Sequence, residues 1–257
     1  MKPTTTKILV AVAFFAMVLV NTLATTLPIN GITLGEVSDS YPNLFAPAGV
    51  AFSIWGLIYL LLGIYVLYQF GVFEKVKEEL NKKIGIYFII TSIANILWIF
   101  AWHYQAIWLS LLIIIALLYY LIRISQALTE EKLSEKAKWL MKLPFSVYFG
   151  WIIVATIANV TVFLVSIGWT GFFISEQAWT SLVIITGTII GLAQMLKAKD
   201  IAYGLVFVWA YGGIWIKHAS FDGFANQYLG IITTILICIA LFIALSGFLL
   251  YKSYREA

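Results

Sequence analysis

The chain has 257 residues, of which 62% are hydrophobic and 11% charged, whereas about 25% of the residues in an average soluble domain are charged. This composition excludes a water-soluble globule. Because a membrane-spanning helix needs roughly 20 apolar residues, the chain has room for roughly seven to nine spans and for no separate soluble domain. The net charge of +4 does not indicate nucleic-acid binding, because the basic residues are dispersed between apolar segments.

Charged residues divide the chain into apolar stretches, and each stretch predicts a transmembrane helix. One stretch is too long for a single helix, and His103, Tyr104 and Gln105 supply a break within it. The sequence therefore predicts an all-α polytopic membrane protein, a single membrane domain over residues 1–257. Its eight expected spans are 8–27, 48–71, 84–102, 106–124, 143–165, 178–196, 200–216 and 227–251.

The basic residues alternate between the loops on the two sides of the membrane. The N-terminus, the loops 72–83, 123–142 and 197–199, and the C-terminal tail hold all Lys and Arg residues except Lys217. Loops rich in Lys and Arg face the cytoplasm, so we expect both termini there. Only two of the sixteen basic residues are Arg, a bias typical of AT-rich bacterial genomes. We therefore expect the protein in a bacterial plasma membrane.

Polar and aromatic residues repeat at helical spacing in three of the predicted spans. The apolar runs contain no carboxylate, which disfavours proton- or cation-coupled transport. The three stripes are Phe52, Gly56, Tyr59 and Gly63; Thr91, Asn95, Trp98 and Trp102; and Tyr148, Trp151, Ala155 and Asn159. Aromatic and amide groups of this kind either line a pocket for a flat apolar ligand or form ordinary helix contacts, and the pattern leaves both open.

Several of these stretches resemble the tryptophan-rich sensory protein and translocator protein (TspO/MBR) family. The resembling segments are LFAPAGVAFSIWGLIYLLLGIY (44–65), ANILW (94–98), the tryptophan at 108 and LPFSVYFGWIIVATIAN (143–159). The resemblance covers residues 8–165 and implies a five-helix bundle that binds porphyrins or other apolar ligands. It places the pocket at Ala51, Phe52, Ile54, Trp55, Trp98, Trp108, Ala155, Ala158 and Asn159. Tyr59, Asn95, Tyr148 and Trp151 join these ligand-binding candidates from the stripes.

The last three spans, at 178–251, have no counterpart in that five-helix core. Gly187 and Gly191 form a GxxxG pair, a motif typical of close helix packing, against the core or against a second copy in a homodimer.

The resemblance implies a sensory or transport role in the lipid bilayer, with a bound tetrapyrrole as the one cofactor considered. Two alternatives are a permease for an uncharged or amphipathic solute and an enzyme that degrades tetrapyrroles, although no catalytic motif is found. His103 and His218 lie on the predicted outer side and are candidate haem ligands, but two interfacial histidines are more typically solvated. Lys217 invites a retinal Schiff base, which the lack of a carboxylate counter-ion disfavours.

Overall fold

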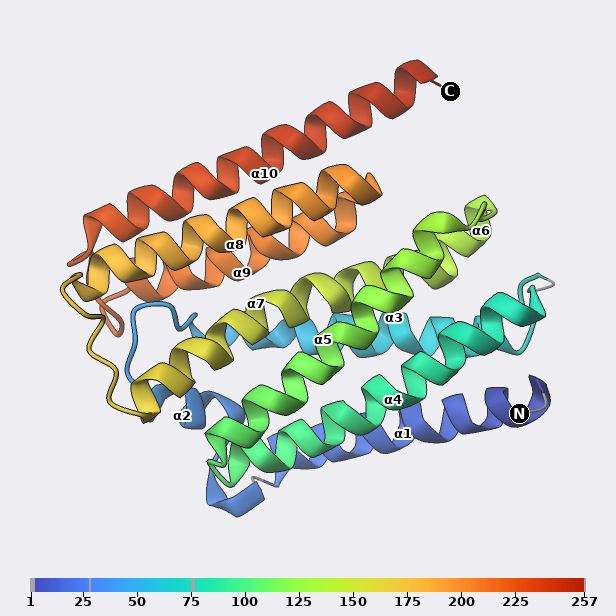
Figure 1. The fold of residues 1–257 in the computed structure, drawn as a ribbon, viewed down its shortest axis with the longest axis horizontal. Helices are drawn as coiled ribbons and strands as arrows, with labels where there is room; N and C mark the ends of the chain where they lie inside the picture. The colour runs from blue at the N-terminus through green and yellow to red at the C-terminus, as the bar shows by residue number, and fades with distance from the viewer. Residues whose placement is uncertain (1–2, 28, 75–76, 257) are drawn as a thin grey trace. The chain divides into compact units, whose positions relative to one another are not determined.

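The computed structural model describes residues 3–27, 29–74 and 77–256, and every regular element in these ranges is a helix. Figure 1 shows their course along the chain. The elements are α1 Pro3–Thr26, η1 Ile29–Gly31, α2 Leu34–Asp39, η2 Gly49–Ser53, α3 Ile54–Gln69, α4 Glu78–His103, α5 Ile107–Glu130, α6 Glu135–Ala137, η3 Lys138–Lys142, α7 Leu143–Ser166, α8 Glu176–Ala198, α9 Ile201–Ala219 and α10 Leu229–Glu256.

Each of the eight predicted spans forms a helix with ends close to those expected. Within the described ranges, seven helical segments are long and apolar enough to cross a membrane, and the protein is an integral membrane protein by this composition. α9 is not among the seven. Its sequence contains glycines, tyrosines and tryptophans and ends in Lys217, His218 and Ala219. These polar and small residues lower its mean hydropathy, so the span expected at 200–216 stays a prediction.

The chain forms two compact units. It passes from one unit to the other after residues 40, 53 and 152, and the last of these points lies within α7. The first unit contains residues 1–40 and 54–152, and the second contains residues 41–53 and 153–257. The predicted division into a core at 8–165 and added helices at 178–251 is a different one and stays a prediction.

In the first unit, α4 packs along α1 on one side and α5 on the other (Figure 1). The turn between α4 and α5 comes where His103, Tyr104 and Gln105 predicted a break, and Gln105 adopts a left-handed conformation there (φ 54°). α3 packs against α1, and its Tyr65 joins α4 and α7: the Tyr65 ring centroid lies 5.4 Å from that of Phe88 and 4.7 Å from that of Phe145. All three rings are buried, so they form the core of this unit.

In the second unit, α8, α9 and α10 pack against one another in pairs (Figure 1). η2 packs on α9. The core is aromatic, with Phe207 and Phe242 stacked at a centroid distance of 4.9 Å. The GxxxG pair of α8 lies against this core: a Cβ atom on Gly191 would be 2.7 Å from Phe242 Cζ, and one on Gly187 would be 2.8 Å from the Tyr211 hydroxyl. The small residues at 187 and 191 therefore permit close packing of α8 on rings of α9 and α10.

Side-chain hydrogen bonds order two of the connecting segments. α2 begins with a capping box, in which Thr33 and Glu36 exchange hydrogen bonds, and these bonds lower the pKa of Glu36. After α3, the Glu74 carboxylate accepts from the Tyr68 hydroxyl at 3.0 Å and from the Ser134 hydroxyl at 2.7 Å. The two bonds lower the pKa of Glu74 and join the 70–74 segment to the start of α6.

Candidate functional site

An aromatic cluster in the first unit brings together four of the predicted ligand-binding residues. Trp55 on α3 stacks on Tyr59 at a centroid distance of 5.5 Å. The same indole meets two rings of α7 edge-on, Tyr148 at 6.0 Å and Trp151 at 6.3 Å. We call these four residues the Trp55 cluster. Tyr59 of the first predicted stripe and Tyr148 and Trp151 of the third thus meet around Trp55, which the family resemblance had placed in the pocket.

Asn95 of α4 adds an amide beside this cluster. Its Oδ1 accepts a hydrogen bond of 2.7 Å from Asn21 Nδ2, which also donates to the Met17 carbonyl at 2.9 Å. Asn95 is fully buried, and its side chain lies beside the Tyr148 hydroxyl. Asn21 and Asn95, which lie inside the expected spans 8–27 and 84–102, thus join α1 to α4, and Asn95 lies next to the aromatic rings.

Three buried polar atoms of this region lack a hydrogen-bond partner among the described residues. They are the Tyr59 and Tyr148 hydroxyls and the Asn95 Nδ2. A buried donor without an acceptor costs about 1–3 kcal/mol, and most buried polar groups in proteins have a partner. The region therefore combines flat apolar rings with donors that a bound molecule could satisfy.

The two other tryptophan candidates lie in different surroundings. Trp98 is buried and stacks on Trp102 at 5.5 Å, and the Trp102 indole donates to the Leu34 carbonyl at 3.1 Å. This contact holds α2 against the end of α4. Trp108 on α5, by contrast, is 60% exposed. The structure thus brings Trp98 into the protein interior and leaves Trp108 at the surface.

The remaining candidates are Ile54, which is buried at the start of α3, and five residues of the second unit. Ala51 and Phe52 lie on η2, and the Ala51 carbonyl accepts from the Trp209 indole at 2.9 Å. On α7, Ala155 and Ala158 are half-buried, and the Asn159 amide donates to the Ala155 carbonyl at 3.0 Å. Ala51 thus contacts α9, a helix outside the region of resemblance.

Both histidines are buried, so the expectation of solvated interfacial side chains was wrong. The Nδ1 of His103 bonds to the Ile99 carbonyl at 2.7 Å, and the Nε2 of His218 bonds to the Leu44 carbonyl at 2.9 Å. Neither side chain has accessible surface. The sequence could not show this burial, because the second bond joins residues 174 positions apart.

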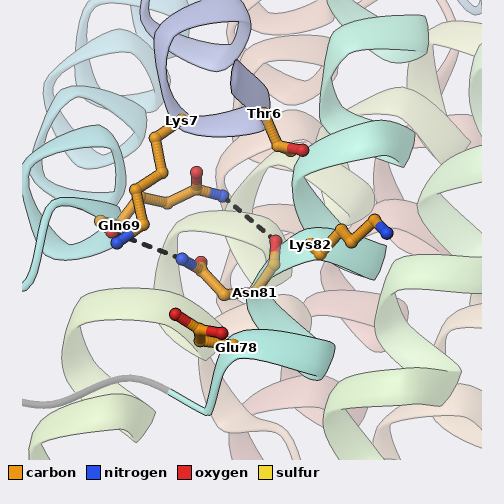
Figure 2. Close-up of a pocket in the computed structure, with 6 residues that line it drawn as sticks. All are labelled: Thr6, Lys7, Gln69, Glu78, Asn81 and Lys82. Carbon is orange, nitrogen blue, oxygen red and sulfur yellow. Dashed lines mark hydrogen bonds between the residues drawn. The ribbon is translucent and has the colours of Figure 1, made fainter. Parts of the chain in front are cut away.

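A small polar cavity lies between the first turns of α1, the end of α3 and the start of α4 (Figure 2). Gln69 Nε2 donates to the Asn81 carbonyl at 3.5 Å, and Asn81 Nδ2 donates to the Gln69 carbonyl at 3.3 Å. The cavity measures about 10 Å³, which suits a single water molecule. It is lined by Thr6, Lys7, Gln69, Glu78, Asn81 and Lys82. The Gln69–Asn81 bonds join the end of α3 to the start of α4, and a cavity of this size leaves no room for an organic ligand. No sequence motif pointed to these residues.

The fold and the Trp55 cluster define a helical integral membrane protein with an aromatic and amide-rich interior. A family model described as TSPO-like protein matches residues 7–248, and the chain belongs to this family. Neither the curated proteins nor the solved structures gave a match. The family match continues through α8 and α9 and into α10, well beyond residue 165, where the sequence resemblance ended.

Proposed function

We propose that this membrane protein binds a flat, largely apolar molecule, such as a porphyrin, at the Trp55 cluster. The observation that carries the proposal is the set of unpartnered polar atoms on Tyr59, Asn95 and Tyr148 beside stacked rings. Ligand pockets are mostly apolar and contain a few polar groups that fix the ligand's orientation. The cluster has this composition.

The donors at the cluster favour a ligand with hydrogen-bond acceptors. The Asn95 Nδ2 can only donate, and a tyrosine hydroxyl can donate or accept. A carbonyl or carboxylate on the ligand would satisfy them, while the ligand's flat face would replace part of the ring contacts that Trp55 now makes. A porphyrin with acidic side chains has both features. A molecule without acceptors would leave the same three atoms unpaired and should bind more weakly.

The proposal is tested by titrating the purified protein with protoporphyrin and following tryptophan fluorescence. We expect saturable quenching. Replacing Asn95 by Leu should weaken binding by about tenfold, since a hydrogen bond to a buried group contributes about 1 kcal/mol or more. Trp55→Phe should lower both the affinity and the extent of quenching. Trp139→Phe is the matched control, because Trp139 is 66% exposed on the connector before α7; it should leave the affinity unchanged.

Two further variants measure how far the site extends. Trp98→Phe should weaken binding if the pocket extends along α4. Trp108→Phe should weaken binding only if the ligand also contacts the surface of α5, because Trp108 is exposed there. Unsaturable quenching, or equal affinities for Asn95→Leu and the unchanged protein, would exclude binding at the Trp55 cluster.

We further propose that such binding serves a sensory or transport role in a bacterial plasma membrane, with both termini in the cytoplasm. Uptake of protoporphyrin by vesicles that contain the protein separates the two roles. Uptake above that of empty vesicles, and lost in Asn95→Leu, would indicate transport. Binding without uptake would indicate sensing. The orientation follows from the alternation of basic loops, and protease access to the two termini in sealed vesicles tests it.

A further inference from the structure

The loop between α7 and α8, residues 167–175, exposes more aromatic surface than a water-facing loop should. Phe173 is fully exposed, and Phe172 is 75% exposed. Ile167 and Ile174 of the same loop are also exposed. No Asp, Glu, Lys or Arg occurs between Lys142 and Glu176. A patch of this kind marks an interaction surface.

The loop has a defined shape that holds these side chains outward. The Trp179 indole donates to the Gly171 carbonyl at 2.6 Å, and its ring packs on Trp169 at a centroid distance of 4.9 Å. A Cβ on Gly171 would lie 2.7 Å from the Trp179 ring, so the close approach requires glycine there. Next to it, Phe172 has a φ of 54°, a left-handed conformation that is unfavourable for a bulky residue. In this strained conformation, the side chains of Phe172 and Phe173 are exposed on the surface of the protein.

The position of the loop indicates what covers it. It joins the end of α7 to the start of α8 (Figure 1), and both are helices that qualify as membrane spans. Nine residues between two spans stay at the bilayer surface. Tryptophan and other aromatic side chains prefer this boundary between headgroups and acyl chains, and burial of one phenylalanine side chain there is favoured by about tenfold or more over exposure to water.

We propose that the 167–175 loop inserts Phe172 and Phe173 into the bilayer interface and so anchors the α7–α8 end of the second unit to the lipid. The partner is the glycerol and upper acyl region of phospholipids in the adjacent leaflet. The inference is independent of ligand binding at the Trp55 cluster, because it rests on residues of the second unit and is tested by depth in the membrane.

Spin-label accessibility in phospholipid nanodiscs with one protein per disc tests the proposal. The label is attached to Phe173→Cys in a Cys238→Ala background, since Cys238 is the sole cysteine. Leu60→Cys on the exposed face of α3 is the lipid reference, and Lys132→Cys on the exposed connector is the water reference. We expect the ratio of oxygen to nickel-chelate collisions at position 173 to exceed that at 132 by about tenfold and to approach that at 60.

A second label, on Thr170→Cys in the same loop, tests whether the phenylalanines hold the loop in place. Replacing Phe172 and Phe173 together by Ser should raise nickel-chelate collisions at position 170 several-fold as the loop moves toward water. A ratio at 173 equal to that at 132 would overturn the proposal, and so would a label that neither reagent reaches, because protein would then cover the loop. An unchanged Thr170 label in the double Ser variant would also overturn the anchoring role.

Discussion

Replacing Gly191 by Ala should destabilise the second unit, because the added methyl group meets two rings that have no room to move. Its Cβ would lie 2.7 Å from Phe242 Cζ and 3.0 Å from Phe207 Cζ. The two rings stack at 4.9 Å and are fully buried, so neither can swing into the lipid without separating α8 from its neighbours. A flexible side chain would yield at small cost, but a stacked pair of rings does not.

The magnitude follows from two opposing effects. Overpacking of a well-filled core costs about 1–3 kcal/mol, and a contact of 2.7 Å belongs to the upper part of that range. Alanine in place of glycine inside a helix returns up to about 1 kcal/mol. The expected net loss is therefore roughly 1–2 kcal/mol, or about 2–8 °C in the midpoint of thermal unfolding for a chain of this size.

Gly212→Ala on α9 is the matched control, because a Cβ there meets nothing within 4 Å. This variant keeps the gain in helix propensity without the clash, so it should unfold at the same temperature as the unchanged protein or slightly higher. Both variants are compared by thermal unfolding in one detergent. Adding Phe242→Leu to Gly191→Ala should restore part of the loss. If Gly191→Ala unfolds no earlier than Gly212→Ala, then α8 does not pack tightly on the two rings.

Two further perturbations test polar contacts of the first unit. Leucine at Asn21 or Asn95 should destabilise the protein, and the double variant should lose less than the sum of the two, with a coupling energy of about 0.6–1.7 kcal/mol; a coupling energy of zero would refute the bond between α1 and α4. Tyr68→Phe removes a hydrogen bond that lowers the pKa of Glu74. Above the ordinary carboxyl pKa of 4.5, this variant should therefore unfold at a lower temperature than the unchanged protein. The difference should disappear as the pH falls through the lowered pKa of Glu74. A difference in unfolding temperature that persists in acid would contradict this role of Glu74.

Helix positions could be predicted from the sequence because the membrane imposes a length on each apolar run and charges mark its ends. The break at residues 103–105 illustrates this, since three polar residues interrupt a long apolar run and the structure turns there. Helical periodicity also predicted which residues share a face. It placed Asn95 and Trp98 on one stripe of α4 and Tyr148 and Trp151 on one stripe of α7.

Periodicity could not predict the partner of each face, because partners are set by contacts between distant segments. Asn21 and Asn95 are 74 positions apart, and nothing local to either residue indicates the other. Trp108 shares the residue type of the buried tryptophans but faces outward on α5. The histidines show the same limit, since a polar ring near a predicted helix end is as compatible with solvent as with a buried bond to a backbone carbonyl.

The second unit gives a physical reason for a family match that includes the last helices. Residues 41–53 precede α3 and carry two of the candidate ligand-binding positions, yet they have little regular structure that could satisfy their backbone groups. α9 supplies the partners: His218 bonds to the Leu44 carbonyl, the Ala48 amide donates to the Gly213 carbonyl, and the Trp209 indole donates to the Ala51 carbonyl.

Each of these backbone groups would cost about 1–3 kcal/mol if buried without a partner, and lipid offers none. The fit is also close in shape, because a Cβ on Gly213 would lie 2.6 Å from the Ala51 Cβ. α9 in turn packs on α8 and α10. The last three helices, α9 directly and α8 and α10 by packing on α9, therefore hold in place the segment that carries Ala51 and Phe52.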